Sequence, residues 1–283
     1  MSSSHPGWTA YEYYPSMGAA VVFVICFAIV TLMHTYHLFR TRTWFFIPLV
    51  IGGYFELVGY IGRAMSSKQS PDWTIGPYVM QSTLLLVAPA LFAASIYMEL
   101  GRIIMMVKGE QFSLIRVGWT TKIFVAGDVL SFLMQASGAG IMVTGTSSAD
   151  PSSSTSTGQN VVIGGLIVQI VFFGFFLISA FIFQQRMGSH SGARAVADEY
   201  PWRKHIILIL IRSIVRVVEY VQGPHGYLME HEVFIYVFDG LLMFAMMVIF
   251  VIIHPSEVNY LLGRGRVVTA MGGLKVMEGS SAV

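Results

Sequence analysis

The residues best able to do chemistry in this chain are ionisable side chains that lie inside long apolar stretches. They are Glu56, Glu99, Asp128, Arg212, Arg216, Glu219 and Asp239. A charge at the centre of a membrane costs about 2.5–3.5 kcal/mol on insertion scales, so such residues usually face a protein interior or a watery cavity and pair with one another. They therefore form either structural salt bridges that fix helix register or a site for a ligand with a polar head.

Spacing places several of these residues on shared helix faces. Arg212, Arg216 and Glu219 are separated by four and then three positions, which puts them on one stripe of a helix. Two further pairs lie seven positions apart, Asp128 with Gln135 and Glu56 with Arg63. A polar stripe from the outer leaflet to the middle of the membrane suits an amphiphile whose tail lies between apolar helices.

The elements that must position these residues are membrane helices. Hydrophobic residues make up 55% of the chain and charged residues only 11%, whereas soluble domains have about 25% charged residues. A membrane helix needs about 20 mostly apolar residues. Seven stretches qualify, namely residues 17–38, 44–63, 78–106, 121–143, 161–184, 205–222 and 233–254. We therefore expect an all-α polytopic membrane protein, a bundle of seven transmembrane helices, in which the sixth stretch is the least apolar.

The distribution of positive charge predicts how this bundle is oriented. Lys and Arg are kept preferentially on the cytoplasmic side of membrane proteins. With the N-terminus outside, the inner segments hold 13 of the 17 Lys and Arg residues, and the outer side holds only Arg63 and Lys68. We therefore expect an extracellular segment (1–16), a seven-helix transmembrane domain (17–254) and a flexible cytosolic tail (255–283). Residues 145–160, which are rich in Ser and Thr, are expected to form an outer loop.

Small residues and one proline predict how the helices pack and bend. Gly59 and Gly62 in the second stretch, and Gly138 and Gly140 in the fourth, would let neighbouring helices approach closely. Pro89 lies inside the third stretch and is expected to kink that helix.

Several function classes find little support in the sequence. A net charge of +2 is too small to indicate nucleic-acid binding, and the single cysteine, Cys26, allows no intramolecular disulfide. The chain has no phosphate-binding loop of the Gly-x-x-x-x-Gly-Lys-Ser/Thr type, so it would not power transport by its own ATP hydrolysis. His34, His37 and His254 could in principle bind zinc in an intramembrane lipid-modifying enzyme. Their expected place near the cytosolic interface makes this a remote alternative, so we expect no enzyme activity, metal or cofactor.

Five ordered runs resemble the fungal RTA-like family, also called the lipid-translocating exporter family. These runs occupy residues 56–63, 88–97, 101–104, 128–135 and 212–220, with further matches at residues 13–16, 138–140 and 232–239. The resemblance covers about residues 11–255, which is nearly the whole chain.

The resemblance implies a seven-span membrane protein linked to export or flipping of sphingoid bases, to resistance against sterol-like toxins or to porphyrin traffic. It implies lipids or amphiphilic small molecules as partners and the plasma membrane as the location. Both a lipid translocator and a seven-span lipid-responsive sensor or receptor fit it, and it leaves open a homo-oligomer or a protein partner. The substrate-binding or translocation residues carried over by the resemblance are Glu56, Arg63, Gln81, Asp128, Gln135, Arg212, Arg216, Glu219 and Asp239.

Overall fold

A computed structural model describes residues 13–70, 73–106, 109–145, 151–187, 202–222, 226–254 and 256. All regular elements within these ranges are helical, which confirms the all-α prediction. They are α1 (Met17–Thr41), η1 (Trp44–Phe46), α2 (Ile47–Lys68), α3 (Ile75–Met106), η2 (Glu110–Phe112), α4 (Val117–Gly145), α5 (Pro151–Met187), α7 (Trp202–Gln222), α8 (Tyr227–Glu230), α9 (Glu232–Ile235), η3 (Tyr236–Leu241) and α10 (Leu242–Ile252).

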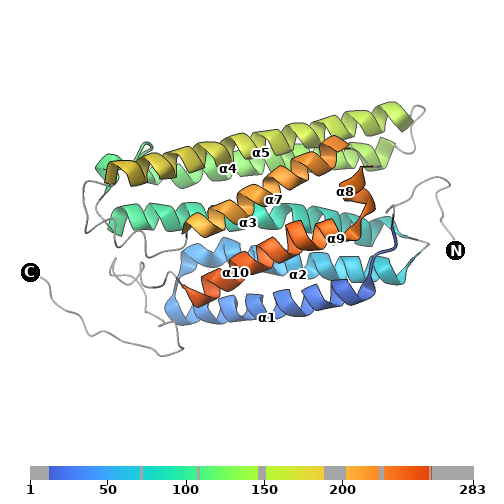
Figure 1. Ribbon diagram of the computed structural model, residues 1–283, viewed down its shortest axis with the longest axis horizontal. Helices are drawn as coiled ribbons and strands as arrows, with labels where there is room; N and C mark the ends of the chain where they lie inside the picture. Colours follow the sequence, from blue (N-terminus) through green and yellow to red (C-terminus); the bar gives the residue numbers. More distant parts are fainter. Residues whose placement is uncertain are drawn as a thin grey trace, which may run out of the picture.

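The long helices run side by side as a bundle (Figure 1). Six segments among the described residues are long and apolar enough to cross a membrane, and the combined segment α9–η3–α10 counts as one of them. The helix α7 is not among the six because it contains Arg212, Arg216 and Glu219. It nevertheless packs against α3, α5 and α10, so it forms a further pass within the bundle. The protein is therefore an integral membrane protein whose most polar helix is shielded by its neighbours.

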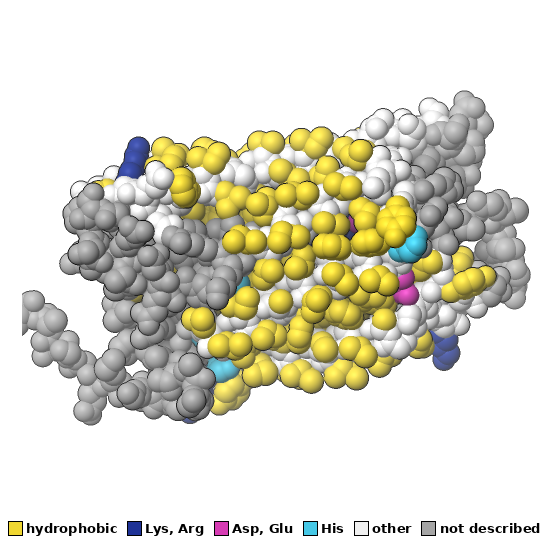
Figure 2. All heavy atoms as spheres, in the orientation of Figure 1, with side chains coloured by type: hydrophobic (Ala, Val, Ile, Leu, Met, Phe, Trp, Pro, Cys, Tyr) yellow, Lys and Arg dark blue, Asp and Glu magenta, His cyan; other side chains and the backbone are white. Residues whose placement is uncertain are grey.

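The outward face of the bundle is apolar along its midsection. Figure 2 shows hydrophobic side chains covering the middle of one face, with Lys and Arg side chains only toward its ends. On α1, the side chains of Val22, Ile25, Ile29 and Leu32 are all more than half exposed. Such a surface matches the hydrocarbon core of a bilayer, where apolar groups need no contact with water.

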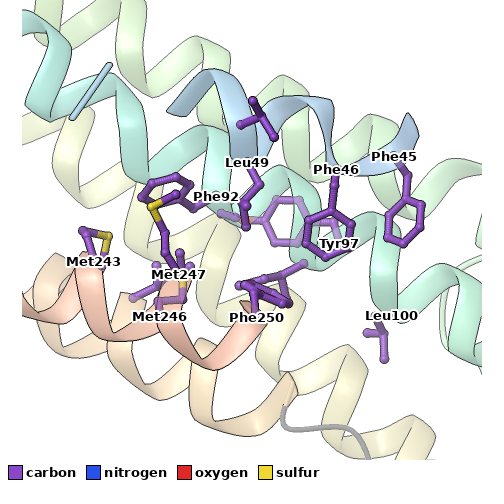
Figure 3. Close-up of a cluster of buried hydrophobic side chains, with 14 of the residues drawn as sticks. Phe45, Phe46, Leu49, Phe92, Tyr97, Leu100, Met243, Met246, Met247 and Phe250 are labelled. Carbon is purple, nitrogen blue, oxygen red and sulfur yellow. The ribbon is translucent and has the colours of Figure 1, made fainter. Parts of the chain in front are cut away.

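The interior is a continuous hydrophobic core in which aromatic and methionine side chains interlock. Met243, Met246 and Met247 on α10 are completely buried and face side chains of α2 and α3 (Figure 3). The ring of Phe250 packs edge-on against that of Phe46, with 5.1 Å between the centroids. Thioether and aromatic side chains fill irregular gaps well, so this core holds α10 against the first half of the chain.

One local prediction about the elements is wrong. Residues 151–160, expected in an outer loop, form the first turns of α5, which begins at Pro151. Proline is well suited to the first position of a helix, because its missing N–H would have no helical acceptor there. The last expected span is present as the helical segment Glu232–Ile252, which includes the π-helical segment η3 and is preceded by the short helix α8. The segments 1–12 and 257–283 lie outside the described residues.

The glycine prediction holds for three of the four positions. A Cβ atom at Gly59 would lie 2.7 Å from the side chain of Leu85, and a Cβ atom at Gly62 would lie 2.9 Å from the side chain of Met80. The helices α2 and α3 therefore approach closely at both positions. A Cβ atom at Gly138 would lie 2.6 Å from the carbonyl oxygen of Gly158 on α5. A Cβ atom at Gly140 would meet no atom within 4 Å, so the expected close approach is absent at that residue.

Candidate functional site

Four of the expected residues form one ionic cluster, which we define as Arg212, Arg216, Glu219 and Asp239. The Asp239 carboxylate accepts hydrogen bonds from both arginines: Arg212 Nε reaches Oδ1, and Arg216 Nη2 lies 3.0 Å from Oδ2. Arg216 Nη1 also lies 3.2 Å from Oε2 of Glu219, three positions further along α7. The helical spacing read from the sequence therefore does bring these α7 residues to one face.

A π-helical segment presents Asp239 to α7. Asp239 lies within η3, where the chain makes a wider turn than in an α-helix before it continues as α10. Single π-helical turns inside helices are frequent at functional sites, because they reorient one side chain without ending the helix. Here the reoriented side chain is the carboxylate that binds two arginines of a different helix.

A small pocket opens beside the ionic cluster, between α7 and the segment α8–α9–η3. Its other lining residues are Val215, Leu228, Phe234, Ile235 and Phe238. The rings of Phe234 and Phe238 are stacked, with 6.0 Å between centroids. One wall of the pocket is thus ionic and the other aliphatic and aromatic. This combination can bind a charged or polar headgroup while an apolar tail stays among hydrophobic side chains.

The four side chains of the ionic cluster differ in how far they are exposed. The side chains of Arg212 and Asp239 are only 4% and 3% exposed, whereas those of Arg216 and Glu219 are 11% and 17% exposed. A headgroup entering the pocket would therefore meet Arg216 and Glu219 first. The pair of Arg212 and Asp239 lies deeper and links α7 to the last membrane pass.

Glu56 on α2 lies near the ionic cluster but is not hydrogen-bonded to it. Its side chain is completely buried, and within the described part of the chain neither carboxyl oxygen has a hydrogen-bond partner. The charged groups close enough to act on it electrostatically are Asp239, Arg212 and Arg216. Glu56 therefore lies close to the central arginines, but among the described residues their direct ion pairs are to the acids on α7 and η3.

Arg63 belongs to a second cluster at the C-terminal end of α2, which we call the outer cluster because it lies away from the middle of the bundle. Its guanidinium donates to the hydroxyl groups of Tyr13 and Tyr236 and to Glu232 Oε1, each over 2.8 Å. Glu232 Oε1 also accepts a hydrogen bond from the backbone N–H of Ser16, likewise over 2.8 Å. Burial raises the pKa of the Tyr13 hydroxyl, while the positive charge of Arg63 acts in the opposite direction. This outer cluster fastens the segment before α1 to α2 and α9.

The remaining expected site residues lie away from the pocket. Gln135 on α4 donates from Nε2 to Oε1 of Gln169 on α5 over 3.3 Å, inside the α4–α5 interface. Asp128 is buried on α4 within the electrostatic reach of Tyr97 on α3. Gln81 is buried on α3 and does not line the pocket. The single polar stripe expected from the sequence is therefore divided between separate places in the bundle.

Sequence reasoning missed three partners of the central and outer clusters. Glu232 lies in a run that was recognised but directly before the expected start of the last span, so it was not counted among the membrane charges. Tyr236 carries no charge, so the pattern of membrane charges does not indicate its role, although it lies four positions from Glu232 on a helix. Leu85 takes part through its backbone, because its carbonyl oxygen accepts a hydrogen bond from Arg212 Nη2 over 2.7 Å, and no side-chain pattern reports this.

The histidines that suggested a remote zinc alternative have other surroundings. The Nε2 atom of His34 lies 3.0 Å from the carbonyl oxygen of Met247, and the ring of His254 lies 5.2 Å from that of His37 and stacks on Phe46. Among the described residues, no group of three or more His, Cys, Asp or Glu side chains is arranged to hold a metal ion.

Comparison with known proteins identifies the group of proteins to which this chain is related. The family described as RTA1 like protein matches residues 49–260, which is more than half of the chain. Protein RTM1 of Saccharomyces cerevisiae is 36% identical over an alignment of 304 residues, gaps included. The alignment covers 88% of this chain and 93% of the relative. Protoporphyrin uptake protein 1 of the same species is 39% identical, with the same coverage of 88% and 93%.

A less similar relative is named as a lipid transporter. The sphingoid long-chain base transporter RSB1 of Saccharomyces cerevisiae is 26% identical over 281 residues, which cover 86% of this chain and 72% of the relative. No solved structure matches the chain. The all-helical membrane bundle and these matches together show that the chain belongs to the RTA1-like protein family, which includes a lipid transporter.

Proposed function

We propose that this protein translocates a lipid or another single-chain amphiphile across its membrane, with the headgroup bound at the ionic cluster. The observation that supports this most directly is the pocket between α7 and α8–α9–η3, which has Arg216 and Glu219 on one wall and Phe234 and Phe238 on the other. An amphiphile needs both kinds of wall at once, because its headgroup must exchange water for polar partners as it leaves the interface.

The position of the pocket fits entry from the lipid. The pocket lies between the C-terminal half of α7 and the first turns of the last pass, and both elements carry exposed apolar side chains such as Val218, Val233 and Val237. A lipid could therefore enter sideways, with its tail still in the bilayer. The buried pair of Arg212 and Asp239 would then be the next ionic contact along the path.

The relatives support the same class of substrate. One relative is named for transport of sphingoid long-chain bases and another for uptake of protoporphyrin, and both substrates combine a charged group with a large apolar part. We further propose that the protein acts in the plasma membrane with the N-terminal segment outside, in agreement with the distribution of Lys and Arg in the sequence.

Reconstitution in lipid vesicles tests this proposal. Purified protein is expected to move a fluorescent sphingoid base across the bilayer faster than empty vesicles do, with a fluorescent phospholipid as the comparison substrate. Arg216→Ala removes a charge-assisted contact that is worth about 1.5–3 kcal/mol, so the rate should fall by roughly tenfold or more. Arg186→Ala, which changes an exposed arginine at the far end of α5, should leave the rate unchanged.

The alternative of a lipid-responsive sensor predicts a different result. A folded protein that binds the fluorescent lipid without moving it would contradict translocation and favour the sensor. Arg216→Lys keeps the charge and should retain more activity than Arg216→Ala, which separates loss of the ionic contact from loss of folding.

A further inference from the structure

The carboxyl group of Glu56 is the one feature of the candidate site that ion pairing does not explain. It is completely buried on α2, and both of its oxygens lack a hydrogen-bond partner among the residues that the structure describes. Tyr60, one helical turn further on, also has a buried hydroxyl without a hydrogen-bond partner. This hydroxyl lies against Gly240 of η3, where an added Cβ atom would come within 2.4 Å of it. The two polar side chains therefore sit on the face of α2 that packs against the segment carrying Asp239.

Physical chemistry determines the state of such a carboxyl group. Moving an ionised carboxylate into a dry, apolar interior without a donor costs so much free energy that the group takes up a proton instead. Asp239 avoids this cost because two guanidinium groups donate to it. Glu56 has no such donor among the described residues, so the same argument favours a neutral carboxyl group with a proton on one of its two Oε atoms.

The charges around Glu56 balance only when it is neutral. The groups that act on it are Arg212 and Arg216 on α7 and Asp239 on η3, and Glu219 completes the ionic cluster. Two positive and two negative charges cancel within this cluster. If Glu56 lost its proton, the site would carry one net negative charge, and a single cation would restore neutrality.

The pocket offers a place for that cation. Glu219 is the most exposed member of the ionic cluster and lines the pocket together with Asp239. A headgroup with one positive charge that enters there would compete with Arg216 for these carboxylates. Arg216, which acts on Glu56 electrostatically, would then be less strongly neutralised and would favour the ionised form of Glu56.

We propose that Glu56 is a proton-binding site that gives up its proton when a cationic headgroup binds in the pocket, so that the protein exchanges protons for cationic amphiphiles. In this step the neutral carboxyl group of Glu56 and the incoming ammonium headgroup become a carboxylate, a bound ammonium and one proton released to water. The inference rests on the proposed translocation, and it adds the ion whose gradient would drive it.

Infrared difference spectroscopy on the protein in lipid vesicles at neutral pH tests the proposal. The wild type is expected to show a C=O stretching band of a protonated carboxyl group that is missing in Glu56→Gln, which keeps the size of the side chain. Addition of hexadecylamine should remove this band in the wild type, whereas hexadecanol, which has the same tail without the charge, should not.

Two further variants make the assignment specific. Glu99→Gln changes another completely buried glutamate, on α3, and should keep the loss of the band on addition of hexadecylamine. Glu56→Asp retains a titratable group, so the band should shift in frequency and still respond to the amine. This variant also keeps the test meaningful if Glu56→Gln folds poorly.

The possible failures are distinguishable. A wild type without a band that depends on Glu56, or an amine-induced loss of band that persists in Glu56→Gln, would overturn the inference. Translocation of labelled lipid without any amine-induced change of the band would also overturn it and leave the proposed function in place. Loss of the band on amine binding without translocation would support the proton site and contradict the proposed function.

Discussion

Arg212 of α7 donates a hydrogen bond to the backbone carbonyl of Leu85 on α3, with 2.7 Å between Nη2 and the oxygen. This carbonyl is available because the residue four positions later is Pro89, which has no N–H to donate within the helix. The proline therefore has a consequence beyond the kink that the sequence predicts. It leaves an unpaired acceptor inside the membrane, where such a group is costly, and the buried arginine of the ionic cluster satisfies it.

Replacement of Pro89 by alanine should weaken this link. The backbone N–H that the substitution introduces would compete with Arg212 for the Leu85 carbonyl, and the arginine would lose a hydrogen bond of the charged type, which is worth about 1.5–3 kcal/mol. We expect a several-fold lower translocation rate in vesicles, together with unchanged or higher thermal stability, because proline is unfavourable inside a helix by about 3 kcal/mol relative to alanine.

The first turn of α3 supplies a matched control for this prediction. Pro77 lies two residues after the helix begins, where a missing N–H breaks no helical hydrogen bond. Pro77→Ala should therefore change neither the rate nor the stability appreciably. Equal effects of the two substitutions would show that the carbonyl of Leu85 has no special role.

Asp239 should be the most important single residue for the integrity of the ionic cluster. Asp239→Asn leaves Arg212 and Arg216 without their shared partner, and loss of one partner from a buried ion pair typically costs about 3–5 kcal/mol. We expect a clear drop in the thermal unfolding temperature of the purified protein in detergent.

Glu219→Gln provides the comparison for Asp239→Asn. Glu219 pairs only with Arg216, and its side chain is 17% exposed, so its removal should lower the unfolding temperature much less. We expect this variant to stay folded and to lose lipid binding instead. An equal loss of stability in both variants would contradict the distinction between a deep structural pair and a ligand-facing carboxylate.

The grouping of Arg212, Arg216 and Glu219 could be predicted because it depends on a single helix. Helical periodicity fixes which side chains of one element share a face, whatever the rest of the fold does. The need for buried charges to be balanced also pointed to Asp239 as a partner. The π-helical segment that aims Asp239 at α7 could not be predicted. Its Gly240 packs closely against Tyr60 and Phe23, which lie far away in the sequence, and helical periodicity does not report such contacts.

The positions of Arg63 and Gln135 show what could not be predicted from the sequence, namely which helices supply the partners of a buried polar side chain. The family resemblance groups both with the central arginines as substrate-binding or translocation residues. Arg63 instead binds Glu232 and two tyrosines, and Gln135 binds Gln169 between α4 and α5. Which helices are neighbours decides such pairings, and a hydropathy pattern contains no information about the neighbours of a helix.

The outer cluster should hold the chain before α1 in place. Glu232 Oε1 accepts from both Arg63 and the backbone N–H of Ser16, so Glu232→Gln removes the charge from two hydrogen bonds. We expect the peptide that contains Ser16 to exchange its amide hydrogens roughly tenfold faster, since charge-assisted hydrogen bonds are worth about 1.5–3 kcal/mol. Hydrogen exchange followed by mass spectrometry measures this.

Glu110→Gln is the control for the hydrogen-exchange experiment. Glu110 is exposed in η2, which follows the C-terminal end of α3 and lies far from Ser16 in the sequence. Exchange near Ser16 should be the same as in the wild type. If Glu232→Gln left exchange at Ser16 unaltered, the hydrogen bond to Glu232 would not be what fastens this segment.

The contact of α4 with α5 depends on a pair of glycines that face each other. A Cβ atom at Gly138 would lie 2.6 Å from the carbonyl oxygen of Gly158. A Cβ atom at Gly158 would likewise lie 2.6 Å from the carbonyl oxygen of Gly138. Both contacts are with backbone atoms, which cannot rotate away as a side chain can. Gly138→Ala should therefore force the helices apart and lower stability by about 1–3 kcal/mol, the usual cost of overpacking.

Gly140, two positions further along α4, is the matched control for this prediction. A Cβ atom there would meet no atom within 4 Å, and alanine is the better helix former by about 1 kcal/mol, so Gly140→Ala should leave the unfolding temperature unchanged or raise it. Thermal unfolding of both variants in the same detergent measures the difference. A loss of stability in Gly140→Ala as large as that in Gly138→Ala would mean that glycine is needed along α4 for a reason other than the close approach of α5.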